Sequence, residues 1–118
     1  MAMTKALTTL QASVAQAAAA TTTGTALNMS TYYGGWLTGI ITNGATGPTL
    51  PGILTVQTSD DNTTFRDAYV FTAGITASIT YTFGIDLPWG VMFVRTKFSG
   101  NTVQAVTIAA EIGAVTAL

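Results

Sequence analysis

The chain has 118 residues, of which only 8% are charged, and it contains neither cysteine nor histidine. This length predicts a single domain. The missing residue types exclude disulfides, thiolate metal sites, cysteine nucleophiles and every catalytic group built on imidazole. The net charge of −1 and the lack of a basic patch argue against binding of nucleic acid through its phosphates. No apolar run is long enough for a transmembrane segment, so we expect neither a nucleic-acid nor a membrane partner.

The low charge has a consequence for the surface. A typical globular domain has about 25% charged residues, whereas 24 of the 118 residues here are threonine. Uncharged polar and small side chains must therefore cover most of the surface. Interspersed charge normally keeps monomers apart. The composition thus allows two interpretations, a β protein with a threonine-rich face or a subunit whose surface is largely buried in an assembly.

Residues 1–24 differ in pattern from the rest of the chain. Five apolar side chains recur there with heptad spacing on one narrow stripe: Met3, Leu7, Leu10, Val14 and Ala17. The alanine-rich run 12–20 favours a helix, but a free helix of this length is marginal in water. We therefore expect a short helix docked on another surface, an extended arm, or a frayed terminus. Our hypothesis is that Met3, Leu7, Leu10 and Val14 contact a partner subunit.

Residues 53–71 have the pattern of a β-hairpin. Leu54 and Val56 alternate with polar neighbours, which is the period of a half-buried strand. The polar residues 59–62 have the side chains that stabilise tight turns. Phe65 then opens a second alternating run, so the segment predicts two antiparallel strands with a polar tip.

Further strands are predicted over residues 25–33, 36–42, 79–83, 92–98 and 103–112. Gly100-Asn101 lies between the last two runs and predicts a two-residue hairpin loop. Seven or eight short strands separated by polar turns are typical of an all-β fold. We expect an antiparallel, jelly-roll-like β-sandwich over residues 25–118, preceded by residues 1–24 as a separate N-terminal arm.

The acidic side chains offer little chemistry. Asp60, Asp61 and Asp67 form the one local acidic cluster, and its spacing matches no complete calcium-binding loop. Capping of the hairpin turn is the simpler interpretation. Asp86 and Glu111 are the remaining carboxylates, and nothing in the sequence pairs them across a cleft. We expect no catalytic residue, no metal site and no cofactor, and we expect that the protein is not an enzyme.

The aromatic residues are better candidates for a binding surface. Trp89 lies in a loop between Pro88 and Gly90, which favours exposure. We expect Trp89 and Trp36 to form exposed aromatic contacts. Together with four tyrosines they could form a sugar-stacking platform, although aromatic side chains fill cores and interfaces equally well. The tyrosines are Tyr32, Tyr33, Tyr69 and Tyr81.

Two resemblances concern known families. The segment 56–65 resembles the strand–Ser-x-Asp–turn–aromatic–strand hairpin of discoidin-like jelly rolls, from which it departs at Asn62-Thr63, where glycine would help the turn. The layout of the whole chain resembles that of small virion proteins of tailed phages, in particular capsid cement or decoration proteins. This layout comprises the Ala/Thr-rich arm, Tyr33-Gly34-Gly35, Ile41-Thr42-Asn43-Gly44, the Gly47-Pro48 loop, the hairpin, and Arg95 to Asn101 before a last strand.

The second resemblance implies a role as well as a fold. It implies a structural virion protein on the capsid surface that binds the major capsid protein or other virion subunits and stabilises the assembled capsid. It also implies a homo-oligomer, a trimer or a dimer. The alternative function is a carbohydrate- or receptor-binding module of a phage tail or of a secreted protein.

Overall fold

The computed structural model describes residues 3–118, and these residues form nine strands joined by loops. No helix that could cross a membrane occurs among them. The strands are β1 (Thr4–Gln16), β2 (Thr22–Thr23), β3 (Leu27–Asn28), β4 (Gly35–Asn43), β5 (Ile53–Ser59), β6 (Arg66–Thr72), β7 (Thr80–Leu87), β8 (Phe93–Ser99) and β9 (Val106–Ala117).

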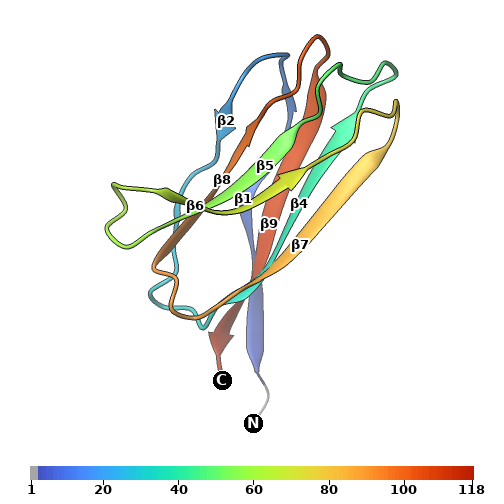
Figure 1. Cartoon of the computed structure of the whole chain (residues 1–118). Coiled ribbons are helices and arrows are strands. Elements are labelled where there is room, and N and C mark those ends of the chain that lie inside the picture. The colour runs from blue at the N-terminus through green and yellow to red at the C-terminus, as the bar shows by residue number, and fades with distance from the viewer. Residues whose placement is uncertain (1–2) are drawn as a thin grey trace.

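The strands form two antiparallel sheets that pack face to face (Figure 1). The first sheet has the order β1-β9-β4-β7, and the second has the order β2-β8-β5-β6, with β3 also paired to β8. The pairs β1–β9, β2–β8, β4–β7 and β5–β6 are nested along the chain, which is the arrangement of a jelly roll. The expected all-β antiparallel sandwich is therefore confirmed.

Alternating apolar residues from both sheets fill the space between them. The first sheet contributes Leu37 and Ile41 from β4 and Ile108 and Ile112 from β9, all almost fully buried. The facing side chains of the second sheet are Leu54, Val56, Val94 and Phe98. This alternation gives each sheet one inner and one outer face, as a half-buried strand requires.

The N-terminal segment differs from its helical interpretation, which is wrong. Residues Thr4–Gln16 form β1, which pairs with β9 from Thr4 opposite Ala117 to Gln16 opposite Val106. β2 also lies within the segment 1–24 and pairs with β8, so this segment supplies a strand to each sheet. Its first two residues lie outside the part of the chain that the structure describes. Pairing with the free edge of β9 satisfies backbone groups, and this tertiary contact outweighs the local helix preference of the alanines.

Two other details of the sequence prediction need correction. The strand expected over residues 25–33 shrinks to β3, after which the chain turns through Tyr32. The two-residue hairpin expected at Gly100-Asn101 is absent, because β8 and β9 belong to different sheets. Asn101 is instead fully buried and donates hydrogen bonds to the backbone carbonyls of Gln104 and, more weakly, Gln16. The loop thus crosses between the sheets and is held by one buried amide.

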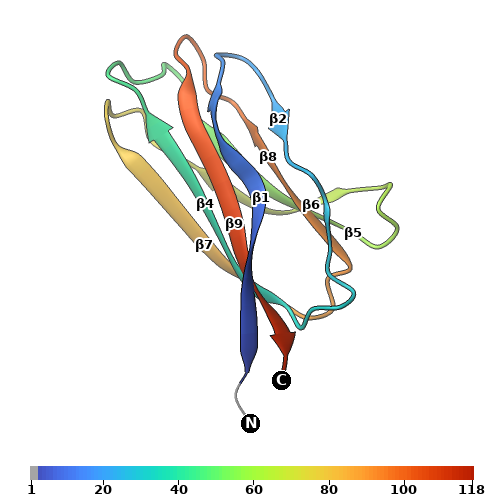
Figure 2. The ribbon, with the colours of Figure 1, turned by 180° about the vertical axis from the view of Figure 1, so that it is seen from behind.

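The hairpin β5–β6 and both chain ends are clear landmarks of the molecule. The hairpin is formed as expected and projects to one side (Figure 1). The lower parts of β1 and β9 run together to the opposite end from the β4–β5 loop, so both termini lie at the same end (Figure 2). The loops before β4 and after β7 meet the first sheet near this end and bring aromatic side chains to it.

Candidate functional site

A hollow of about 500 Å³ lies at the end of the molecule that carries the two termini, and we call it the terminal hollow. It is formed by the ends of β1, β9, β4 and β7 and by the loops before β4 and after β7. Its lining residues are Met3, Lys5, Tyr33, Gly35, Trp36, Asp86, Leu87, Pro88, Trp89, Gly113 and Val115.

Trp36 is the residue at its centre, and its position follows from the strand register. On the outer face of the first sheet, Trp36 of β4 lies opposite Gly113 of β9 and opposite Asp86 of β7. The indole crosses over Gly84, where an added Cβ would lie 2.5 Å from Cζ2 and 2.9 Å from Cε2 of Trp36. Glycine within a strand often marks such a close approach. Gly84 therefore leaves the room that lets a large side chain lie on the sheet.

Tyr33 and Trp89 extend the aromatic surface beyond the sheet. Their ring centroids are 6.5 Å apart with a tilt of 43°, within the range of a favourable aromatic pair. The backbone N–H of Tyr33 donates to the carbonyl of Val115 at 2.8 Å, which fixes its loop against β9. The side chains of Met3, Tyr33, Trp36 and Trp89 are 54%, 44%, 56% and 70% exposed. Four large apolar side chains thus face solvent in one place.

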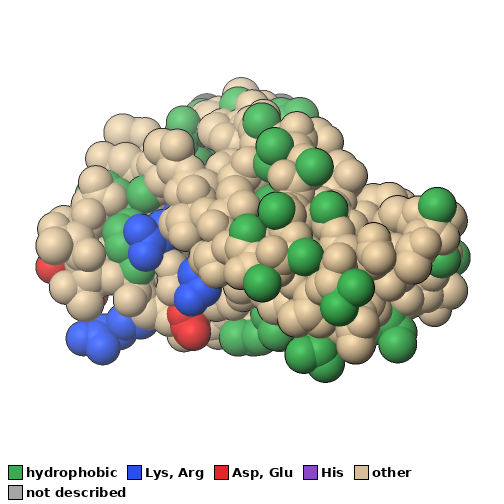
Figure 3. Space-filling model, turned by 90° about the horizontal axis from the view of Figure 1, so that it is seen from above, with side chains coloured by type: hydrophobic (Ala, Val, Ile, Leu, Met, Phe, Trp, Pro, Cys, Tyr) green, Lys and Arg blue, Asp and Glu red, His purple; other side chains and the backbone are tan. Residues whose placement is uncertain are grey.

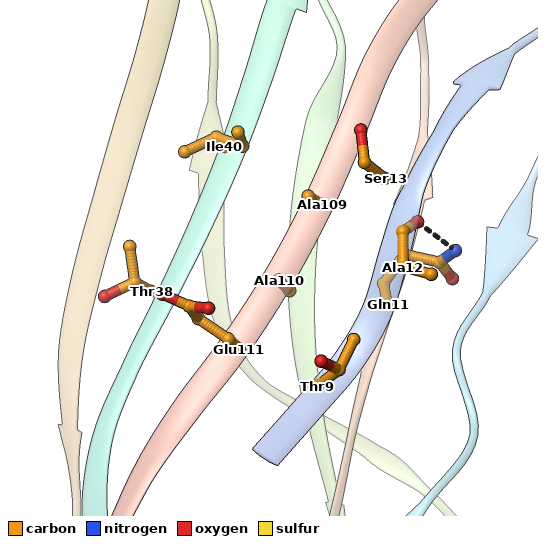
Figure 4. Close-up of a pocket in the computed structure, with 9 residues that line it drawn as sticks. All are labelled: Thr9, Gln11, Ala12, Ser13, Thr38, Ile40, Ala109, Ala110 and Glu111. Carbon is orange, nitrogen blue, oxygen red and sulfur yellow. Dashed lines mark hydrogen bonds between the residues drawn. The ribbon is translucent and has the colours of Figure 1, made fainter. Parts of the chain in front are cut away.

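A second hollow, of about 430 Å³, lies further along the same outer face, and we call it the face hollow (Figure 4). In the register, Glu111 of β9 lies between Thr9 of β1 and Thr38 of β4. Figure 4 shows the Glu111 side chain extending toward Thr38. The irregular pairing of β1 around Gln11 opens the space beside these strands. The lining residues are Thr9, Gln11, Ala12, Ser13, Thr38, Ile40, Ala109, Ala110 and Glu111.

Both hollows belong to one continuous strip of the first sheet. Trp36 and Gly113 of the terminal hollow form one cross-strand pair. The next pair on the same face is Thr38 and Glu111 of the face hollow. The strip carries few charges, since Lys5, Asp86 and Glu111 are the charged residues among those that line the hollows. It can offer an aromatic contact at one end and hydroxyl, amide and carboxylate groups at the other.

The acidic hairpin tip has a different arrangement. Asp61 accepts hydrogen bonds from the backbone N–H groups of Thr64 and Thr63 and from the Ser59 hydroxyl. In that order, these bonds hold the pKa of the Asp61 carboxyl below its ordinary value. The carboxylate therefore stabilises the turn, with Asn62 in the left-handed region at φ 59°. Within residues 3–118 no group of three acidic, histidine or cysteine side chains is placed to hold a metal ion.

The structure brings together three of the six residues singled out in the sequence. Met3, Trp36 and Trp89 line the terminal hollow, and Leu7 is exposed on β1 opposite Gly113. Leu10 has to be corrected as a partner contact, because it is 4% exposed and packs in the chain's own core. Val14 is partly exposed further along β1, opposite Ile108. The heptad spacing predicted one common face for these four side chains, but the irregular strand β1 buries Leu10 and leaves Leu7 and Val14 exposed.

Sequence reasoning missed the polar partners of the aromatic side chains. Lys5 and Asp86 enter the terminal hollow only because β1 and β7 flank the central strands. The isolated Gly84 within an alternating strand was an available signal of a close backbone approach. Among the tyrosines of the possible platform, Tyr33 joins the site. Tyr32 and Tyr81 pack against the core instead, and Tyr69 lies on the second sheet.

Comparison with known proteins shows a likeness in fold. No protein-family model matches the chain, and no curated protein matches its sequence. Among solved structures, it is similar to the crystal structure of the PBSX exported protein XepA, with a TM-score of 0.68 and 12% sequence identity. The match covers 93% of this chain and 37% of XepA, so the chain spans little more than a third of that protein.

Proposed function

We propose that this chain is a structural protein of a tailed phage, which docks on another protein of the particle through the terminal hollow. The observation that carries the proposal is the group of exposed aromatic and methionine side chains at one end of an almost uncharged face. Tyrosine, tryptophan and methionine are enriched in protein interfaces, and charged residues are depleted from the centres of interfaces. The chain also shares its fold with the PBSX exported protein XepA, which is compatible with this role.

The more specific form of the proposal is a capsid cement or decoration protein. In this form the partner is the major capsid protein, the location is the capsid surface, and docking stabilises the assembled shell. Tryptophan side chains that enter pockets of a partner often dominate the binding energy. Trp36 is suited to this role because the sheet beneath it fixes its position, and Trp89 because it is the more exposed of the two.

Co-sedimentation with tailed-phage particles assembled without this protein tests the proposal. We expect the wild-type chain to sediment with the particles and the Trp36→Ala and Trp89→Ala variants to lose at least tenfold in affinity. Tyr69→Ala is the matched control, because Tyr69 is also a partly exposed aromatic residue but lies on the second sheet. Equal binding by all four chains would exclude the terminal hollow as the docking site. Binding to tails but not to capsids would exclude the cement role.

A carbohydrate-binding module is the second candidate function, and one observation favours it. The Trp36 indole lies on the sheet beside Asp86, and Glu111 and Thr38 follow on the same face. Aromatic faces stack on sugar rings, and carboxylates accept hydrogen bonds from sugar hydroxyls. Calorimetric titration with maltohexaose and chitohexaose tests this function. Binding that is lost in both Trp36→Ala and Glu111→Gln would support it, and the absence of heat with either sugar would count against it.

A further inference from the structure

The sandwich has four sheet edges, and one of them differs from the others. An exposed edge strand is a template for pairing with another chain, and proteins usually protect it with charges, bulges, proline or short length. β1 has three irregularities in its pairing with β9. β2 and β3 have two residues each, and β6 has a bulge and begins with Arg66-Asp67. Three of the four edges therefore carry such protection.

β7 is the edge without protection. It pairs with β4 over eight consecutive residue pairs, from Thr80 opposite Thr42 to Leu87 opposite Gly35, with no irregularity. It has no proline, and its single charge is Asp86 near one end. No other described strand pairs with it, and both ribbon views show its outer side uncovered (Figures 1 and 2). Alternate backbone N–H and C=O groups along β7 therefore point outward without a strand partner.

We propose that the β7 edge pairs antiparallel with the β7 edge of a second copy of this chain, about a two-fold axis at Phe83. This register places Tyr81 opposite Ile85 of the second copy, so half-buried apolar side chains meet on the inner face. On the outer face it places Thr80 opposite Asp86. The first sheet of each copy then joins into one sheet of eight strands, and the surface patch is the same on both subunits, as two-fold symmetry requires.

The pattern of apolar, threonine and charged side chains along the edge favours this arrangement. In the antiparallel register each Asp86 lies opposite a neutral threonine. The two Asp86 residues are then about 20 Å apart, at a rise of about 3.4 Å per residue. This separation exceeds the Debye length of about 8 Å at physiological ionic strength, so their repulsion is screened. Parallel pairing of the same two edges would require the second copy to be turned over, so that its threonine face would adjoin the half-buried apolar face of the first copy. The edge is thus complementary to itself in one direction only.

Sedimentation equilibrium with two variants of Thr80 tests the register. Thr80→Asp places a second carboxylate opposite Asp86 at both ends of the pairing, and we expect the dimer dissociation constant to rise roughly tenfold. Thr80→Lys places a cation there, and we expect the dissociation constant to stay equal or fall. Both variants lose the same hydrogen bond between the Thr80 and Thr42 hydroxyls, so any loss of fold stability is matched. The difference between the two should shrink at 1 M salt.

Two further measurements make the result decisive. Thr72→Asp adds the same charge to β6, an edge strand of the second sheet, and should leave dimerisation unchanged. The chain has no cysteine, so Phe83→Cys should form an intermolecular disulfide across the axis under mild oxidation. A chain that stays monomeric, or a dimer that responds alike to Asp and Lys at residue 80, overturns the proposal. Because the test uses the isolated chain, its outcome is independent of docking through the terminal hollow.

Discussion

The outer face of the second sheet is covered by its own long side chains, whereas the outer face of the first sheet is left open. On the second sheet, Gln57 of the central strand β5 is buried, although it is on the outer face. It donates to Asp67 at 2.8 Å and accepts from Nε of Arg95 at 2.8 Å, and the Arg95 guanidinium lies 3.8 Å from the ring centroid of Phe65. Long side chains from neighbouring strands therefore cover this face and satisfy its polar groups.

The outer face of the first sheet has no such cover. Its central strands present Trp36, Thr38, Ala109 and Gly113 in the same positions, and small side chains leave two hollows. Seen from the end opposite the termini, the Lys and Arg side chains gather toward the side that carries the β5–β6 hairpin, and other side chains fill the rest (Figure 3). Most charged residues thus belong to the second sheet and its hairpin, and the outer face of the first sheet, which carries Lys5, Asp86 and Glu111, remains available to a partner.

The largest expected effect separates the core role of β1 from its surface role. Leu10→Ala should lower the free energy of unfolding by about 2–5 kcal/mol, because Leu10 is buried between the sheets. Leu7→Ala on the same strand should change it by about 0.5 kcal/mol or less, since Leu7 is 69% exposed. Urea denaturation measures both. Equal effects would mean that β1 is an arm outside the core.

The second prediction compares matched positions on the two outer faces. Gln57→Leu should lower the free energy of unfolding by about 1–3 kcal/mol, because it leaves Asp67 and Arg95 without their hydrogen-bond partner. Thr38→Val on the first sheet removes a hydroxyl that is not part of such a network and should change stability by about 0.5 kcal/mol or less. Thermal unfolding followed by circular dichroism measures both. A larger effect of Thr38→Val would reverse the comparison.

The support beneath Trp36 can be tested by fluorescence. In a Trp89→Phe background, Trp36 is the only tryptophan, because the chain has two. Gly84→Ala should displace the indole and change its emission maximum and its quenching by acrylamide. Gly113→Ala is the control, since an added Cβ there meets nothing within 4 Å. Identical spectra for both variants would show that Gly84 does not position the indole.

The smallest expected effect concerns the hairpin tip and pH. The pKa of Asp61 is lowered in the folded chain, so its carboxylate stabilises the fold at neutral pH and this contribution is lost as pH falls through the folded pKa. Asp61→Asn should therefore melt slightly below the wild type at neutral pH. The difference should shrink on acidification below the ordinary value of 3.8. A difference that grows toward low pH would contradict this assignment.

The fold could be predicted from the sequence because period-two alternation is a strong local signal. It located the β5–β6 hairpin, the strand at Trp36 and the buried face of β9 that carries Ile108 and Ile112. It failed at residues 4–16, where irregular pairing breaks the alternation and alanines favour a helix locally. The crossing at Gly100-Asn101 was missed because turn residues indicate a change of direction but not which sheet follows.

The candidate site could be predicted only in part. Exposure of Trp89 followed from its loop position, and Trp36 was expected to form an exposed contact. Their meeting with Met3 required the pairing of β1 with β9, which depends on contacts between residues more than 100 positions apart. Gly84 could have indicated a close approach, but not by which side chain. Long-range register, rather than local pattern, creates the site.

Hydroxyl-radical footprinting of the chain bound to phage particles tests the central claim most directly, because it reports which face is covered. We expect Met3, Trp36 and Trp89 to be protected from oxidation in the bound chain, and Tyr69 on the second sheet to react as in the free chain. Protection of Phe65, whose ring lies against the Arg95 guanidinium, with unchanged oxidation of both tryptophans would contradict the account, because the face that satisfies its own polar groups would then be the docking surface.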